Sequence, residues 1–343
     1  MKPHIIWKKV GITLLSLLLF FVCSGLLYVT KLANSVAPAP QEDIADITNP
    51  HVVDEAKAKM GDYWTVAIFG VDSRSGSYKD TTSDAILLCT VNKESGEVRL
   101  ASVYRDTLTR RPGEEHMLQK INQSYRQGAA SAVMALNENL DLQVEDYVTF
   151  SFQAAADAVN LLGGIDIEIT KAEAAYINSF ITETVNVTGI PSEQLSGEGY
   201  QHLDGVQTVA YCRLRLMDTD FERTRRQREV IELILEKLKH ADLAVVNQIL
   251  VTVLPQIETS INDEDLLPFA KNMGDYRLVG ATGFPFQHEE AHINSLNGNF
   301  VLPSTLESNV VQLHQFLYQD EDYQCSQTVK DISREILKLA VKN

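Results

Sequence analysis

A run of 21 residues without a charged side chain, Val10 to Thr30, constrains the fold of this chain more than any other feature of its sequence. Leu, Phe, Val, Ile and Gly make up most of the run. About 20 such residues cross the hydrocarbon core of a membrane as a helix, because lipid offers no hydrogen-bond partner to an open backbone. Three lysines precede the run and the first acidic residue is Glu42. The positive-inside bias therefore predicts a single-pass protein of the cell membrane, with a cytoplasmic N-terminus over residues 1–9, a transmembrane helix over 10–30 and an extracellular body.

A cleaved signal peptide is the alternative interpretation of the same run, with Ser35-Val36-Ala37 as a small-residue cleavage site. The apolar region of a signal peptide usually has only about 7–15 residues, which is shorter than this run, so we favour an uncleaved anchor. Under both interpretations the chain after residue 40 is exported. Prolines and small residues then predict a tether over residues 31–60, followed by a main domain over 61–320 and a C-terminal helical tail over 321–343.

The exported part of the chain is strongly acidic. The whole chain carries 30 basic and 46 acidic residues, and residues 1–35 hold four lysines and no acid, which leaves 26 bases against 46 acids and a net charge of −20 for the rest. Such a surface repels a nucleic-acid backbone, so we predict no nucleic-acid partner. The three cysteines of this part are expected to be buried thiols, and we expect no zinc site.

Three apolar, β-rich segments open the main domain. We predict strands over Thr65–Val71, Ala85–Val91 and Val98–Val103. The link between the second and the third is short and turn-rich, so these two should form an antiparallel hairpin. If the three strands run up, down and up, Asp72, Asp84 and Arg105 lie at one edge of the sheet, where active sites commonly collect.

Helices and strands alternate through the rest of the main domain. Apolar residues at helical spacing predict helices over Ala129–Leu140, Phe152–Leu162 and Phe221–His240. Ile165–Ile169 alternates as a half-buried strand does, and Thr208–Leu216 is strand-like as well. We also predict short helices and loops over 171–206, one or two helices within 241–267, short strands over 280–302, and C-terminal helices over 309–317 and 327–339. The predicted fold class is α/β, with a single mixed β-sheet flanked by helices.

Arginine is concentrated in one stretch of 16 residues, which holds six of the 14 arginines in the chain. Arg213 and Arg215 lie two residues apart on the predicted strand, so their side chains should leave the same face. On the following helix, Arg223, Arg226 and Gln227 extend the apolar stripe toward the N-terminal turns. Buried guanidinium groups are costly unless paired, and a helix N-terminus favours negative charge. Both features indicate a bound anion, and the forked donors of arginine suit phosphate.

An internal ion-pair network with acids such as Asp218 and Asp220 is the alternative interpretation of these arginines, since such networks also gather charge. Arg225 and Arg228 face the other side of the helix and have glutamates four residues further on, a pattern typical of a solvated surface. Basic groups beside two carboxylates at a strand edge indicate a phosphate site with Mg²⁺.

Eight short motifs also follow one another in a characteristic order. They are Gly70-Val71-Asp72-Ser73-Arg74, Ser83-Asp84, Tyr104-Arg105-Asp106-Thr107, Lys120-Ile121-Asn122, Leu162-Gly163-Gly164-Ile165-Asp166, Leu203-Asp204-Gly205, Tyr211-Cys212-Arg213-Leu214-Arg215, and Asp220-Phe221-Glu222-Arg223 with Arg226-Gln227. Each motif is weak alone, but in this order they closely resemble the LytR-CpsA-Psr family of bacterial cell-envelope proteins. The resemblance covers about residues 63–240 and is looser beyond.

This resemblance implies a phosphotransferase that moves a glycopolymer from a polyprenyl-pyrophosphate carrier in the cytoplasmic membrane to peptidoglycan. The polymer would be a teichoic acid, a capsular polysaccharide or a related secondary polymer, and an apolar tunnel between sheet and helices would take the polyprenyl tail. By the same resemblance, Asp72 and Asp84 hold a divalent metal, Mg²⁺ (or Mn²⁺). The residues implied to bind the pyrophosphate are Arg74, Arg105, Lys120, Arg213, Arg215, Arg223, Arg226 and Gln227. The implied catalytic residues are Asp72, Asp84, Arg105 and Asp106, with Asp106 or another carboxylate to orient or deprotonate the attacking sugar hydroxyl.

Three positions depart from the family pattern: Thr82 stands where Arg is common, Tyr104 replaces a common Pro, and Glu222 replaces a common Gly. Because Glu222 adds a negative charge near the implied site, we expect an effect on affinity or on the choice of acceptor. A membrane-anchored regulatory protein that binds polyprenyl phosphate and a lipid pyrophosphatase are the alternative functions.

Overall fold

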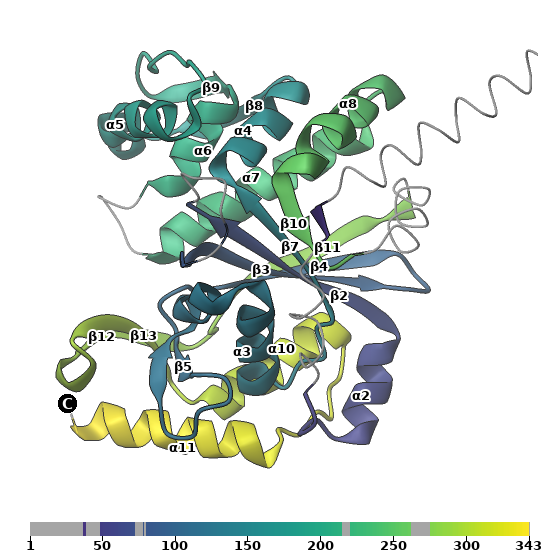
Figure 1. Ribbon diagram of the computed structural model, residues 1–343, viewed down its shortest axis with the longest axis vertical. Coiled ribbons are helices and arrows are strands. Elements are labelled where there is room, and N and C mark those ends of the chain that lie inside the picture. The colour runs from purple at the N-terminus through teal and green to yellow at the C-terminus, as the bar shows by residue number, and fades with distance from the viewer. Residues whose placement is uncertain are drawn as a thin grey trace, which may run out of the picture.

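A mixed sheet of seven strands crosses the middle of the molecule, with helices on both of its faces (Figure 1). The structure is a computed structural model that describes residues 37–38, 49–72, 78, 80–214, 220–261 and 275–342. The strand order is β1-β10-β7-β2-β3-β4-β11. These strands are β1 (Ala37–Pro38), β10 (Ile257–Thr259), β7 (Asp146–Ser151), β2 (Tyr63–Val71), β3 (Ser83–Asn92), β4 (Glu97–Val103) and β11 (Arg277–Phe284).

The three strands predicted first, β2, β3 and β4, are neighbours and pair antiparallel, as expected. β7 and β11 extend the sheet on either side by parallel pairing with β2 and β4. Side chains alternate between the two faces along each strand. Phe69 and Leu88 point into one core, whereas Leu87 and Leu100 point into another. Both faces are covered, which explains why these strands are uninterrupted apolar runs in the sequence.

One face of the sheet packs against the lower layer of Figure 1, which combines early segments of the chain with its C-terminal end. Its core includes Leu136 of α3, Leu313 of α10 and Ile332 of α11. Because α11 packs on α3 and β5, the predicted C-terminal tail is joined to the body of the fold. This layer holds α2 (Asp54–Gly61), β5 (Leu108–Arg110), β6 (Leu118–Lys120), η2 (Ile121–Gln127), α3 (Ala129–Leu140), β12 (His288–Ile293), η5 (Asn294–Leu296), β13 (Gly298–Pro303), α10 (Leu306–Tyr318) and α11 (Gln327–Lys342).

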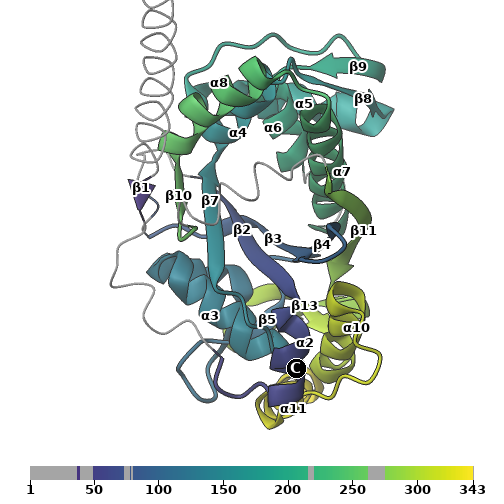
Figure 2. The same cartoon turned by 90° about the vertical axis from the view of Figure 1, so that its right-hand side faces the viewer.

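The other face is covered by helices from the middle of the chain, which form the upper layer in Figures 1 and 2. α7 packs directly on the sheet, since its Ile231 and Leu235 contact the cluster around Leu87 and Leu100. The remaining helices pack mainly on one another around a second apolar cluster. This layer holds α4 (Phe152–Leu161), β8 (Ile165–Ile169), α5 (Lys171–Thr188), β9 (Gly199–Leu203), α6 (Gly205–Arg213), α7 (Asp220–Lys239), α8 (Leu243–Val253) and η3 (Leu254–Gln256).

Two sequence-based assignments in this upper layer are wrong. Within the segment predicted as a strand over Thr208–Leu216, the residues up to Arg213 belong to the helix α6 (residues 215 and 216 lie outside the described residues), and this helix begins at a capping box formed by Asp204 and Gln207. Residues 171–206, predicted as short helices and loops, contain the single 18-residue helix α5. In the first case the β-branched residues favoured a strand, but tertiary packing outweighs their modest intrinsic preference. The strands β7, β9 and β10 were not predicted either.

The predicted transmembrane helix over 10–30 lies outside the described residues. Within the described part of the chain, no helix combines the length and apolar character needed to cross a membrane.

Candidate active site

A cavity of about 280 Å³ lies between the sheet and the helices α4 to α7. Its walls are mostly apolar, with Phe150 and Phe152 on one side and Val230 and Ile234 of α7 on another. The lining also includes charged and polar side chains, which come from the sheet edge, from α5, from the last residue of α6 and from the first turns of α7, and which are called the polar end of the cavity below. The residues that give it this character are Asp72, Asp84, Glu183, Arg213, Arg223 and Gln227.

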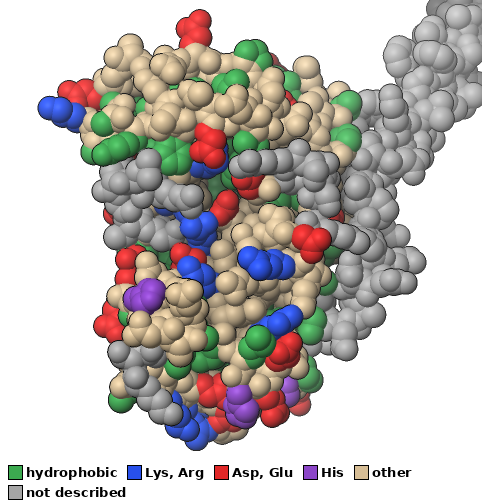
Figure 3. Space-filling view, turned by 60° about the vertical axis from the view of Figure 1, so that its left-hand side comes forward, with side chains coloured by type: hydrophobic (Ala, Val, Ile, Leu, Met, Phe, Trp, Pro, Cys, Tyr) green, Lys and Arg blue, Asp and Glu red, His purple; other side chains and the backbone are tan. Residues whose placement is uncertain are grey.

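The aspartates come from neighbouring strands. Asp72 directly follows β2, and Asp84 is the second residue of β3, so the antiparallel pairing of these strands brings both to the same edge. Arg105 follows the end of β4 and donates a hydrogen bond from Nη1 to Asp84. The predicted meeting of Asp84 and Arg105 at one sheet edge is therefore confirmed. Figure 3 shows basic and acidic side chains gathered across the hollow middle of one face of the molecule.

A row of neighbouring charges continues from Arg105. The Lys120 Nζ lies 3.0 Å from Asp106 Oδ1, and Asp106 Oδ2 lies 3.9 Å from the Nε of Arg105. The Lys120 ammonium also lies 5.4 Å from the centre of the Phe300 ring. Asp106 thus lies next to Arg105 and Lys120, and none of these three residues is among those that line the cavity.

The helix α7 presents its predicted face to the cavity. Arg223 and Gln227 line the polar end, and Val230, Ile231 and Ile234 continue the same stripe along the apolar wall. The Nε2 of Gln227 donates to the carbonyl of Cys212 at 3.3 Å, which fixes the amide against α6. The sequence-based assignment of this helix face is therefore confirmed for these five residues, but not for Arg226.

Arg213 reaches the cavity from the last residue of α6, not from a strand as predicted. Three contacts hold its guanidinium. Nη1 donates to Thr184 Oγ1 at 2.8 Å, Nη2 lies 3.0 Å from Glu183 Oε1, and the group stacks 4.8 Å from the centre of the Phe152 ring. The geometry leaves Arg213 at the polar end of the cavity, where an anion can approach it.

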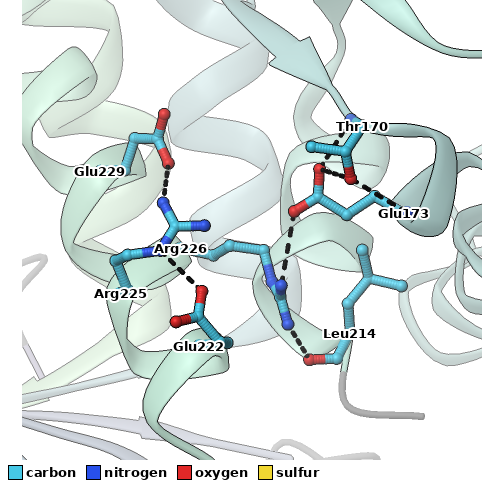
Figure 4. A network of polar contacts seen from close by, with 7 residues as sticks. All are labelled: Thr170, Glu173, Leu214, Glu222, Arg225, Arg226 and Glu229. Atoms are coloured by element: carbon cyan, nitrogen blue, oxygen red, sulfur yellow. Dashed lines mark hydrogen bonds and ion pairs between the residues drawn. The ribbon is translucent and has the colours of Figure 1, made fainter. Parts of the chain in front are cut away.

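Arg226 occupies a different place, which corrects its predicted contact with pyrophosphate. Its side chain is only 1% exposed, and its Nη1 lies 3.4 Å from Glu173 Oε1 while Nη2 donates to the carbonyl of Leu214 at 2.8 Å (Figure 4). It does not line the cavity. Glu173 is itself fixed in the capping box of α5 with Thr170. The internal ion pair considered from the sequence is thus realised at Arg226, but its acid is Glu173, 53 residues away.

The two arginines predicted to lie on the outer side of α7 differ from each other. Arg225 is exposed and pairs with Glu229 at 3.1 Å, as its spacing indicated. Arg228 is instead partly buried, so desolvation lowers the pKa of its guanidinium, and a hydrogen bond with Tyr104 opposes that shift. Arg74 and Arg215, both predicted to bind pyrophosphate, lie outside the described residues.

Comparison with protein families matches residues 27–310 of the chain to the LytR_cpsA_psr family. The chain belongs to this family. Among its relatives, the polyisoprenyl-teichoic acid–peptidoglycan teichoic acid transferase TagT of Bacillus subtilis is 27% identical over 244 residues, which is 69% of this chain and 73% of TagT. The transferase TagU of Bacillus licheniformis is 31% identical over 234 residues, which is 67% of this chain and 70% of TagU.

Solved structures support the fold of this LytR_cpsA_psr protein. Protein gbs0355 from Streptococcus agalactiae superposes with a TM-score of 0.62 at 21% identity, covering 82% of this chain and 93% of that one. The structure of TagT bound to LIIa-WTA has a TM-score of 0.58 at 21% identity, covering 76% of this chain and 92% of that one. The mixed sheet flanked by helices is therefore the fold of the family.

Two features of the site were not predicted from the sequence. The first is Glu183, which no sequence pattern marks as a site residue. It meets its partner Arg213 only when α5 and α6 pack together. The second is an aromatic cluster beside the arginines, in which the Tyr104 ring lies 4.6 Å from Phe221 and 5.2 Å from His288. The sequence marks Tyr104 only as a departure from the family pattern. In the structure its ring packs against Phe221 in the first turn of α7.

A metal-binding pattern in the sequence does not form a metal site. His288 to His292 reads His-Glu-Glu-Ala-His, the spacing that binds zinc when it lies on a helix. Here the segment is the strand β12, on which residues four apart are separated by roughly 13 Å. Among the described residues, no group of three or more His, Cys, Asp and Glu side chains is arranged to hold a metal ion.

Asp72 and Asp84 fit a magnesium site of another kind. Mg²⁺ is commonly held by one or two carboxylates and completed by substrate phosphates and water. Both aspartates line the end of the cavity where Arg213, Arg223 and Gln227 also lie. This donor set suits a cation that binds together with a phosphorylated ligand.

Proposed function

We propose that this protein is a phosphotransferase that attaches a glycopolymer, a teichoic acid or a related polymer, from a polyprenyl-pyrophosphate carrier to peptidoglycan. The observation that carries the proposal is the composition of the cavity, where a mostly apolar chamber is also lined by two aspartates, a glutamate, two arginines and a glutamine. A polyprenyl diphosphate has the same division into an apolar tail and an anionic head. The names of the relatives TagT and TagU agree with this activity.

The bound carrier would place its tail against Phe150, Phe152 and Val230 and its diphosphate at the polar end. Arg213, Arg223 and Gln227 donate hydrogen bonds to the phosphate oxygens, since forked donors suit that geometry. Mg²⁺ or Mn²⁺ on Asp72 and Asp84 would neutralise charge on the diphosphate when bound. Arg226 does not contact the carrier, but its hydrogen bond to the carbonyl of Leu214 holds the backbone next to Arg213 in place.

The reaction is a displacement at the sugar-proximal phosphorus. A sugar hydroxyl of peptidoglycan attacks, its new oxygen–phosphorus bond forms, and the bond to the bridging oxygen breaks so that polyprenyl phosphate leaves. Asp106 or another nearby carboxylate accepts the hydroxyl proton; Asp106 is a candidate because its Oδ2 lies 3.9 Å from the Nε of Arg105, which in turn binds Asp84. Arg105 and the other arginines stabilise the charge that moves to the leaving group, which is usually the largest contribution in phosphoryl transfer.

The proposal includes the location of the reaction. The predicted anchor over 10–30 would hold the domain at the outer surface of the cytoplasmic membrane, where the carrier lipid and peptidoglycan are both within reach. The cavity then takes its substrate directly from the lipid phase.

The test is the transfer of labelled polymer from a polyprenyl-pyrophosphate donor to peptidoglycan by the purified full-length protein. We expect Arg105→Ala and Asp84→Ala each to lower the rate roughly 10²–10³-fold, by analogy with other electrostatic sites. Arg334→Ala on α11 is the matched control, because Arg334 is an exposed arginine in the lower layer. Rates of the site variants equal to wild type would refute the proposal. Release of free polymer in place of coupled product would indicate the pyrophosphatase, and binding without turnover the regulatory protein.

A further inference from the structure

Glu183 is a negative charge in a cavity that the proposed function fills with an anion. It projects from α5 and lines the same chamber as Asp72 and Asp84. Asp72 and Asp84 have a clear role as hard ligands for a cation. Glu183 instead pairs with Arg213, one of the arginines placed to bind the diphosphate, at 3.0 Å. The proposed mechanism gives this carboxylate no task.

Two ion pairs join α5 to arginines of the upper layer, and they are built differently. Glu173 and Arg226 are 4% and 1% exposed, and the surrounding protein holds both. Glu183 is 50% exposed, while its partner Arg213 is 14% exposed. A half-exposed ion pair contributes little to stability, because water solvates the separated charges almost as well. The Glu183 carboxylate can therefore leave Arg213 at low cost, whereas the Glu173 carboxylate cannot leave Arg226.

Arg213 does not depend on Glu183 for its position. Thr184 accepts a hydrogen bond from Nη1, and the ring of Phe152 lies under the guanidinium. The nitrogen paired with Glu183 is Nη2. Bidentate binding of a phosphate needs two nitrogens of one guanidinium, so the ligand and the Glu183 carboxylate compete for Nη2.

We infer that Glu183 is an exchangeable anion that occupies Arg213 when the cavity holds no phosphate, and that it sets the affinity for the lipid phosphate. This inference rests on the proposed function, in that the ligand of Arg213 is a polyprenyl phosphate or pyrophosphate. Competition from Glu183 weakens binding of the carrier and speeds its departure. An enzyme that must release polyprenyl phosphate after every turnover gains from such a competitor, since tight binding of substrate and product alike does not raise its turnover.

The experiment measures binding of octaprenyl pyrophosphate to the full-length protein in detergent by titration calorimetry, and its dissociation by chase with excess lipid. Glu183→Gln keeps the shape of the side chain and removes its charge. We expect a dissociation constant about three- to tenfold lower than wild type and a correspondingly slower dissociation. Glu168→Gln on β8 is the matched control, because it makes the same change of net charge at an exposed position outside the cavity, and it should bind as wild type does.

A double-mutant cycle tests whether Glu183 affects the affinity for the lipid through Arg213. In an Arg213→Ala background, Glu183→Gln should no longer tighten binding, since the competition takes place on Arg213. An equal gain in that background would show a general charge effect and overturn the inference. Unchanged or weaker binding by Glu183→Gln would also overturn it, the latter by showing that Glu183 positions Arg213. Thermal unfolding of each variant confirms that it is folded. If wild type itself does not bind octaprenyl pyrophosphate, the proposed function fails, which is a separate result.

Discussion

The two faces of the central sheet meet very different layers. On the lower face, residues of the sheet, α3, α10 and α11 form one continuous apolar cluster. On the upper face the apolar residues divide into two clusters. Val230 and Ile231 are consecutive on α7 yet belong to different clusters, and both line the cavity between them. One face is thus packed for stability, whereas the other keeps a chamber open.

This difference shows how a single sheet serves two purposes. A closely packed layer gains the full free energy of burial, and the loss of any large side chain there is costly. A layer that contains a chamber buries its apolar side chains less completely and so gains less free energy of burial. Other interactions must therefore hold its helices in place. The buried pair of Arg226 with Glu173 joins α7 to α5 across the upper layer, and Arg226 also binds the chain at Leu214. The comparison leads to four predictions.

The largest effect is expected when this buried pair is broken. Arg226→Ala leaves Glu173 as an uncompensated carboxylate in the interior, which should lower the free energy of unfolding by about 3–5 kcal/mol. Denaturant unfolding measures the change. Arg225→Ala on the exposed side of the same helix is the control and should change stability by less than about 1 kcal/mol. Equal effects of the two variants would mean that the buried pair does not hold the upper layer.

Truncation of apolar side chains tests the comparison directly. Leu313→Ala removes a fully buried side chain from the lower cluster and should cost about 2–5 kcal/mol. Ile234→Ala removes a side chain that already borders the cavity, so we expect a cost below about 1.5 kcal/mol. Both variants are compared by urea unfolding. Costs of similar size would contradict the difference between the faces.

The stability of the lower layer should depend on pH through His314. This imidazole stacks on Tyr323 at 3.6 Å and contacts the carbonyl of Leu140, and burial lowers its pKa from 6.5 to about 4. Between pH 6.5 and 4 the imidazole of His314 is protonated in the unfolded chain but stays neutral in the native chain. The free energy of unfolding, which is at its full value above pH 6.5, therefore decreases as the pH falls toward 4. The loss amounts to about 3 kcal/mol at most. Unfolding of wild type and His314→Gln at pH 7.0 and 4.5 measures it, and a similar pH dependence in both would exclude His314 as the cause.

The smallest effect concerns two thiols, one in each layer. Burial raises the pKa of both Cys212 and Cys325 to about 12, so each should react with a thiol reagent roughly a thousandfold more slowly than a free cysteine. Cys212 lines the cavity, whereas Cys325 lies in the lower cluster. Octaprenyl pyrophosphate should slow the labelling of Cys212 further and leave that of Cys325 unchanged, as read by mass spectrometry of the separate peptides. Protection of both thiols would indicate general stabilisation by the ligand, without occupancy of the cavity.

Much of the sheet and of its functional edge was predictable from local pattern. The runs of β2, β3 and β4 and the turn between the last two imply their pairing, and that pairing alone brings Asp84 to Arg105. The face of α7 was predictable because helical spacing is fixed at 3.6 residues per turn. The strand assigned over Thr208–Leu216 was wrong for the residues up to Arg213. Their β-branched and aromatic side chains suit a strand, but Asp204 and Gln207 cap a helix there.

The roles of the arginines were the part that the sequence left open. Three of these arginines lie close together in the sequence, namely Arg213, Arg223 and Arg226. For each of them the sequence allowed either a phosphate site or an ion-pair network. The structure divides them: Arg213 and Arg223 line the cavity, and Arg226 is held by Glu173. That division depends on where α5 packs, which no pattern within residues 213–228 encodes.

The amino-acid sequence by itself determined the periodic features of this protein: the sheet order of β2 to β4, the buried face of α7, and the motifs that resemble the LytR-CpsA-Psr family. These follow from distances of a few residues along the chain, which strand and helix geometry convert directly into shared edges and faces. Only the tertiary structure decided which charges meet across 30 residues or more, such as Glu183 with Arg213 and Glu173 with Arg226. The reason is physical, because a charge interacts with whatever lies within a few ångströms of it, and packing decides which residues those are.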